Sequence, residues 1–230
     1  MDGSGARELR VRPYERDDRF AVRDVCFRTG YMGEPVDWQW RDQPSFADMF
    51  TGYYTDREPE SAFVVEVDGR VAGYLLGCVD SSRAWSPGRV AARNIVRRGI
   101  VLRPGTARVV WRTLGDAVRD LALRRVKLRD LEFEDPRWPA HLHIDLLPEA
   151  RGGGAGRRLV HAWLDRLREL GVPGCHLQTM SENANAIAFF GAVGFRRLGR
   201  PVLIPGLRTR LGYRLHEQVM VIDLDAKERP

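Results

Sequence analysis

Apolar and polar residues alternate along this chain in short runs typical of β-strands and in longer runs with helical spacing. Strand-like runs are expected at 9–14, 62–67, 70–79, 141–147 and 175–180, with two further runs near 195–199 and 217–224. Helices are expected over 17–29, after Ser45, and over 89–102, 106–123, 155–170 and 181–194. Hairpin strands come first and β-turn-α units come last, so the pattern predicts an α/β fold around a mixed sheet.

Short signals mark where these elements begin and end. Asp68-Gly69 separates two β-rich runs and is a strong hairpin signal. Asp17 or Asp18 is expected to cap the first helix, and Ser45 the second. Apolar stripes are expected at Phe46, Met49, Phe50 and Tyr53, at Ala92, Ile95, Val96 and Gly99, and at Val110, Trp111, Leu114, Val118 and Leu121.

One strand-to-helix junction contains almost no side chains. In LHIDLLPEARGGGAGRRLV, residues 142–160, a strand-like run meets a proline and an arginine, then four glycines within five positions, then a helix. A dinucleotide fingerprint would place its third glycine at Arg157, and a Walker loop would need GK[ST], so neither fits. The spacing R-x-x-G-x-G fits, at Arg151, Gly154 and Gly156.

This junction has the chemistry of an anion site. Glycines let the backbone close tightly around a ligand, and the free N–H groups that open a helix attract negative charge. Arg151, Arg157 and Arg158 add positive charge. The segment therefore predicts a site for a phosphate or pyrophosphate group.

Two motifs resemble those of a known family. LLPEARGGGAGRRLV is similar to the acyl-CoA pyrophosphate loop of the GNAT superfamily of N-acyltransferases, and NANAIAFFGAVGF, residues 183–195, resembles its later N-x-x-A-x-x-x-Y-x-x-x-G-F signature. The resemblance covers about 9–79 and 140–224. It implies a mixed, mostly antiparallel sheet flanked by helices, and acetyl-CoA as co-substrate without a metal. AHLHIDLLPEA also resembles acetyltransferase-like modules linked to O-GlcNAc hydrolases and their free-standing bacterial relatives, which are not all catalytic.

The resemblance also implies a coenzyme site. Backbone groups of Leu146 and Leu147 would meet the pantetheine arm, the turn amides would wrap the pyrophosphate, and Asn183 would touch the arm. Asn183 is equally suited to cap a helix. The full expected set is Leu146, Leu147, Arg151, Gly152, Gly153, Gly154, Ala155, Gly156, Arg157, Asn183 and Phe190.

Candidate catalytic groups alternate along the strand before the turn. Asp145 can accept a proton from an amine or orient His143 to do so, and a backbone N–H near Leu146 is the family's usual donor to the thioester carbonyl. Alternatively, His141, His143 and Asp145 satisfy one another, or bind a metal ion. Gln178 stands where some relatives carry a glutamate base.

Phe190 is the main departure from the family's pattern. It occupies the position where most active relatives place a tyrosine that protonates the departing thiolate. Phenylalanine has no proton to give, but expelling a thiolate at pH 7 costs only about 2 kcal/mol relative to the thiol, and Ser181 or Tyr213 could substitute. The alternative is a catalytically inactive acyl-CoA-binding or partner-binding module of the same fold.

Positive charge is concentrated in one segment. The chain has a net charge of +6, and residues 81–139 contain 14 basic and six acidic residues. Relatives have a short connection here, so we expect a basic helical insertion at 80–139, between the third and fourth strands. It could cover an anionic acceptor, act as a lid, pair two subunits, contact a membrane surface, or present a solvated arginine face. No nucleic-acid motif is present.

The remaining features bound the class of protein. Cys26, Cys78 and Cys175 are far apart and odd in number, which favours buried cysteines in a reducing cytoplasm over a disulfide framework. The start has no apolar segment typical of a secretory signal. We therefore expect a flexible tail at 1–8, one acyltransferase-like domain at 9–230, and a cytoplasmic bacterial N-acetyltransferase acting on a primary amine of a small molecule or peptide.

Overall fold

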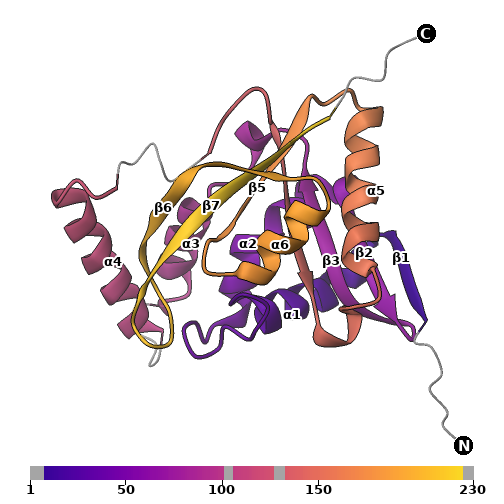
Figure 1. The fold of residues 1–230 in the computed structure, drawn as a ribbon. Helices are drawn as coiled ribbons and strands as arrows, with labels where there is room; N and C mark the ends of the chain where they lie inside the picture. The colour runs from indigo at the N-terminus through magenta and orange to yellow at the C-terminus, as the bar shows by residue number, and fades with distance from the viewer. Residues whose placement is uncertain (1–7, 101–105, 127–132, 225–230) are drawn as a thin grey trace, which may run out of the picture.

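A computed structural model describes residues 8–100, 106–126 and 133–224, centred on a seven-stranded sheet (Figure 1). The strand order is β1-β2-β3-β4-β5-β7-β6, and every neighbouring pair is antiparallel except β4–β5. The strands are β1 Leu9–Pro13, β2 Ala62–Val67, β3 Arg70–Cys78, β4 Ala140–Leu146, β5 Gly174–Met180, β6 Arg196–Arg208 and β7 Arg214–Asp223. The mixed, mostly antiparallel sheet predicted from the sequence is confirmed.

Helices cover both faces of this sheet. Those in the described residues are α1 Arg19–Thr29, α2 Gln43–Arg57, α3 Pro87–Arg97, α4 Ala107–Ala122, α5 Ala155–Glu169 and α6 Ala184–Ala192. Gly77 of β3 lies against Trp163 of α5, whereas the next residue, Cys78, contacts Tyr53 of α2. Successive strand residues point to opposite faces, so α5 covers one face, and α2 with its neighbour α1 covers the other.

The opening hairpin follows the sequence prediction closely. β2 spans the predicted residues, and β3 ends one residue early. Asp68 and Gly69 have φ of 50° and 75°, the left-handed pair of a two-residue turn that matches strand twist. β6 is longer than predicted because register shifts within its pairing with β7 accommodate Gly199, Pro201 and Gly206.

The predicted helix caps need correction. Asp18 does precede α1, but its carboxylate accepts hydrogen bonds from Arg12 and from the Glu15 N–H and makes no cap. Asp42, not Ser45, caps α2, accepting from the Ser45 N–H at 3.1 Å. The Ser45 hydroxyl is already occupied, because it donates to the Asp42 carbonyl and accepts from Trp40.

The basic insertion between β3 and β4 contains α3 and α4, whose apolar stripes are only partly buried. Most of the stripe of α4 faces solvent, with Trp111 62% and Val118 67% exposed, whereas Val110 at its start is buried. On α3, Val96 is exposed while Val90 and Asn94 are buried. The predicted end of this helix, 101–102, lies outside the described residues.

Ion pairs explain the orientation of α4. Asp116 and Asp120 of α4 are buried on the inward side of the helix, where they pair with Arg208 and Arg214 of the β6–β7 hairpin. The helix backbone also approaches β6 so closely that a Cβ on Gly206 would lie 2.5 Å from Thr113. The polar side of α4 therefore packs inward, and α4 lies at the margin of the molecule (Figure 1). No helix among the described residues combines the length and apolar character needed to cross a bilayer.

This orientation predicts an inverted pattern of mutational effects on α4. Asp120→Ala should lower the free energy of unfolding by about 2 kcal/mol, because it removes a buried carboxylate and leaves Arg214 paired with Asp116 alone among the described residues. Leu114→Ser should change it by less than about 0.5 kcal/mol, because that side chain is already exposed. Urea unfolding of the two variants provides the measurement. A larger loss for Leu114→Ser than for Asp120→Ala would contradict the orientation.

Candidate active site

The parallel strands β4 and β5 separate soon after they meet. In the described residues their pairing is confined to Ala140–Cys175 and His141–His176. Beyond this point β4 stays paired with β3, and β5 with β7. We call the facing unpaired edges, 142–146 and 177–180, the β4–β5 gap.

Peptide groups of β4 point into this gap. Leu147 donates its N–H to the Ala72 carbonyl at 2.8 Å, so the peptide groups of alternate residues, including Asp145, also face β3. Those of Ile144 and Leu146 face the opposite way, toward the β4–β5 gap. Their N–H groups have no strand partner and can donate to the carbonyl of a ligand.

The glycine turn after β4 presents a row of free amides. A short 3-10 turn, Pro148–Ala150, follows the strand, then Gly152 and Gly154 adopt φ of 81° and 76°. The backbone N–H of Arg158 donates to the Gly154 carbonyl at 3.1 Å, but the backbone N–H groups of 152–157 have no acceptor among the described residues. A Cβ added at Gly152 or Gly154 would meet nothing within 4 Å. Open space next to unsatisfied donors at a helix N-terminus makes this turn suitable for an anion.

The arginines of the turn support its backbone. Arg151 donates to the Leu146 carbonyl at 2.8 and 2.9 Å and to the Gly33 carbonyl at 2.7 Å. Arg158 donates to the Leu9 and Gly153 carbonyls. These guanidinium groups therefore fix the turn against the first strand and the loop after α1, and they add positive charge behind the amides.

Asp145 carries a carboxylate that titrates near neutrality. It faces α1, and Tyr74 on the adjacent strand donates to it at 2.5 Å. Burial raises the pKa of Asp145 to about 7, although hydrogen bonds from Tyr74 and Thr29 act in the opposite direction. A carboxylate of this pKa can both accept and release a proton at physiological pH.

His143 lies on the same sheet face but is a weaker base. Burial lowers its pKa to about 4, so its ring is neutral at pH 7. The ring packs edge-on against Phe50 and Tyr54, and in the described structure it has no hydrogen bond to Asp145. The expected orienting contact between Asp145 and His143 is therefore not formed.

His141 has a structural role. The single hydroxyl proton of Ser81 goes to the Pro139 carbonyl, so the contact of 2.7 Å between Ser81 Oγ and His141 Nδ1 requires an Nδ1–H donor. Nε2 then accepts from the Tyr54 hydroxyl at 2.7 Å. Both ring nitrogens are occupied. In the described part of the chain, no group of three or more His, Cys, Asp or Glu side chains is arranged to hold a metal ion.

Glu217 is a second unusual carboxylate, which the sequence analysis missed. It lies opposite Met180 in the β5–β7 ladder, on the same sheet face as Asp145 but across the β4–β5 gap. Burial raises its pKa to about 7, and Gln178 donates to it at 2.6 Å. Gln178 itself is exposed, so solvent reaches this pair. The signal available in the sequence was that Glu217 lies on a β-rich run. That run forms the strand that pairs with the strand of Gln178.

Comparisons with known proteins identify the family. A model described as the Acetyltransferase (GNAT) family matches residues 26–195. The chain belongs to the GNAT family of acetyltransferases. SsHAT, for which a crystal structure exists, shares 30% sequence identity with this GNAT protein. The two structures match with a TM-score of 0.67, and the match covers 95% of this chain and 99% of that chain.

More distant GNAT structures share the fold. The structure of yncA from Salmonella typhimurium, determined with its cofactor acetyl-CoA, is 16% identical, with a TM-score of 0.55 over 96% of this chain and 97% of that chain. The polyamine N-acetyltransferase of Drosophila melanogaster is 15% identical, with a TM-score of 0.53 over 94% of this chain and 100% of that chain.

The second GNAT motif occupies α6 and its start. Asn183 caps this helix, its side-chain oxygen accepting from the Ala186 N–H at 3.1 Å. Phe190, expected beside the coenzyme, is 6% exposed and packs edge-on against Phe189 and Phe195. Phe189 takes the position next to the turn, 3.1 Å from where a Cβ of Gly156 would lie.

The remaining candidate groups are three buried cysteines and the two alternative acids, Ser181 and Tyr213. Cys26, Cys78 and Cys175 are buried, and burial raises the pKa of each thiol, that of Cys175 to about 12. Tyr213 is 70% exposed on the loop between β6 and β7. Ser181 follows β5 directly and donates its N–H to the His216 carbonyl, so it is the nearer of the two alternative acids to the gap.

Two glycines that flank α5 allow a matched test of the turn. Gly154 precedes the helix and Gly171 follows it, and both have positive φ and open space at Cβ. Replacing either by glutamate should cause similar backbone strain. Only Gly154→Glu places a negative charge among the free amides, so it should weaken coenzyme A binding at least tenfold, about 1.4 kcal/mol.

Isothermal titration calorimetry with coenzyme A measures this difference directly. Equal affinities for Gly154→Glu and Gly171→Glu would show that the turn does not hold the coenzyme.

Proposed function

We propose that this GNAT protein transfers an acetyl group from acetyl-CoA to a primary amine of a small molecule or peptide, by direct attack within a ternary complex. The observation that carries the proposal is the combination of free amides at 152–157 with the unpaired edge of β4 that leads to them. An anion site and a row of strand-like donors in continuity suit a ligand with a diphosphate at one end and an amide-rich arm at the other.

Each part of the coenzyme has a complementary group in the chain. The amides of 152–157 would hold the pyrophosphate, and the β4 edge would hold the pantetheine arm as an added strand. The free N–H of Ile144 or Leu146 would polarise the thioester carbonyl, since a donor aimed at a developing oxyanion lowers the barrier. Holding both reactants in line supplies further rate.

Asp145 is the preferred proton acceptor. As the amine nitrogen bonds to the thioester carbon, it must lose a proton, and a carboxylate of pKa about 7 can take it. Tyr74 holds the carboxylate in place through its hydrogen bond. Glu217, on the same sheet face, is suited to remove the earlier proton of an incoming alkylammonium.

The same carboxyl can compensate for the missing tyrosine. When the carbon–sulfur bond breaks, the thiolate requires a proton, and a thiol has a pKa of about 8.5. A protonated Asp145 of pKa about 7 would give up its proton to that thiolate with a free-energy gain of about 2 kcal/mol. Proton transfer from the amine to Asp145 and then to sulfur therefore balances without a tyrosine at position 190.

A second candidate function is a catalytically inactive acyl-CoA-binding module. The observation that favours it is Phe190, which is buried in the core where most active relatives place the tyrosine acid. The resemblance of AHLHIDLLPEA to hydrolase-linked modules, not all catalytic, points the same way. Such a module would be stabilised thermally by coenzyme A without turnover.

Release of free thiol from acetyl-CoA, measured across a broad panel of primary amines, separates the two candidates. We expect turnover, and we expect Asp145→Asn to reduce kcat by a factor of about 10² to 10⁴, because the general base is lost. Its affinity for coenzyme A should be retained, since the turn is unchanged. Absence of turnover with every amine, together with coenzyme-dependent stabilisation, would favour the inactive module.

The pH dependence should report the ionised carboxylate. The base works only when deprotonated, so the rate should rise with pH up to about 7 and then level off. Tyr74→Phe removes a hydrogen bond that lowers the pKa of Asp145, so it should move this rise to higher pH. A profile with the same midpoint in the wild type and in Tyr74→Phe would exclude Asp145 as the titrating group.

A further inference from the structure

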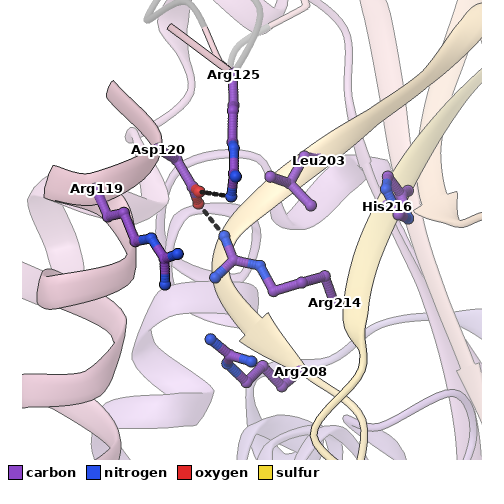
Figure 2. A pocket seen from close by; sticks show the side chains of 7 residues that line it. All are labelled: Arg119, Asp120, Arg125, Leu203, Arg208, Arg214 and His216. Atoms are coloured by element: carbon purple, nitrogen blue, oxygen red, sulfur yellow. Dashed lines mark hydrogen bonds and ion pairs between the residues drawn. The ribbon is translucent and has the colours of Figure 1, made fainter. Parts of the chain in front are cut away.

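A basic cavity lies between α4 and the β6–β7 hairpin, apart from the glycine turn. Its volume is about 360 Å³, and Figure 2 shows arginine side chains entering it from both sides. The polar residues that line it are Arg119, Asp120, Arg125, Arg208, Arg214 and His216. It is separate from the coenzyme site, because none of these residues belongs to β4, the turn or α5.

Positive charge exceeds negative charge around this cavity. Arg208 binds Asp116 through two hydrogen bonds of 2.8 and 2.9 Å, and Arg214 pairs with both Asp116 and Asp120. These two carboxylates balance two guanidinium groups. Arg125 is only loosely associated, 3.9 Å from Asp120, and Arg119 makes no ion pair with any described residue. Among the described residues, three of the four arginines around the cavity therefore contact two carboxylates, and the nearby Glu182 contacts His216.

One buried donor in the cavity wall also lacks a partner. The Nε–H of Arg214 is buried and has no hydrogen-bond acceptor among the described residues. Leaving a buried donor of a charged group unsatisfied costs free energy, and arginine has no acceptor atoms with which to satisfy a neighbour. Arg214 thus brings to the cavity wall one donor that has no acceptor among the described residues.

We propose that this cavity binds a phosphate group, either free or carried as a monoester by a small molecule. A phosphate monoester carries between one and a half and about two negative charges at neutral pH and three acceptor oxygens, which suit the arginine-rich lining and the unpaired donor. The bound group would bridge Arg119 and Arg125, at and just beyond the end of α4, to Arg214 of β7 (Figure 2).

The test uses the full chain saturated with coenzyme A, so that the glycine turn is already occupied when inorganic phosphate is titrated in. Calorimetry should show saturable binding. Arg119→Gln should weaken it at least tenfold, and its melting temperature without phosphate should match the wild type, because Arg119 has no ion pair to lose. Phosphoethanolamine, titrated in parallel, shows whether a monoester binds more tightly than free phosphate.

Arg112→Gln is the matched control, because Arg112 is exposed on the same helix and does not line the cavity. It should leave phosphate affinity unchanged. Absence of saturable binding, or an equal loss in Arg112→Gln and Arg119→Gln, would overturn the site.

If the chain fails to bind coenzyme A, the titration is run on Gly154→Glu, in which the turn carries a negative charge. The fate of the phosphate site is then decided independently of the acetyltransferase proposal.

Discussion

The separation of two parallel strands is the constraint on which this structure depends. β4 and β5 pair at only two residue pairs, yet each remains fixed by an antiparallel neighbour on its other side. Backbone N–H and C=O groups on an unpaired edge must find water or a ligand. The edge of β4 leads directly into the glycine turn, so the unpaired donors of strand and helix form one continuous surface. This arrangement of backbone suits an extended, anionic ligand, with few side chains required.

Side chains matter more for proton transfer, and here the decisive effect is desolvation. Asp145 and Glu217 are ordinary carboxylic acids whose pKa values rise to about 7 because the sheet and its helices exclude water. The same burial lowers the pKa of His143 to about 4 and so weakens the residue that is the more usual base. Of the two expected candidates, Asp145 and His143, burial therefore favours the carboxylate as the base.

Charge also determines how the insertion is attached. An amphipathic helix usually places its apolar stripe against the core, because hydrophobic burial is favourable. In α4 the buried positions hold Asp116 and Asp120, whose pairing with Arg208 and Arg214 anchors the helix through its polar side. Arginines on the helix and on the hairpin then gather in one cavity, and the apolar stripe remains at the surface.

Local signals in the sequence were sufficient for the hairpin at Asp68-Gly69, for the strand–turn–helix at 141–170 and for the family, because each depends on backbone preferences of neighbouring residues. The same locality explains what the sequence left open. Whether Phe190 or Phe189 faces the turn, whether His141 is free or satisfied by Ser81 and Tyr54, and which side of α4 is buried all depend on partners distant in the chain. Glu217 approaches the candidate site only through the pairing of β5 with β7. The sequence by itself determined which backbone segments form and where a glycine turn leaves free amides at the start of a helix. The tertiary structure alone decided which side chains lose water and which charges meet, because pKa values and ion pairs depend on distances in space.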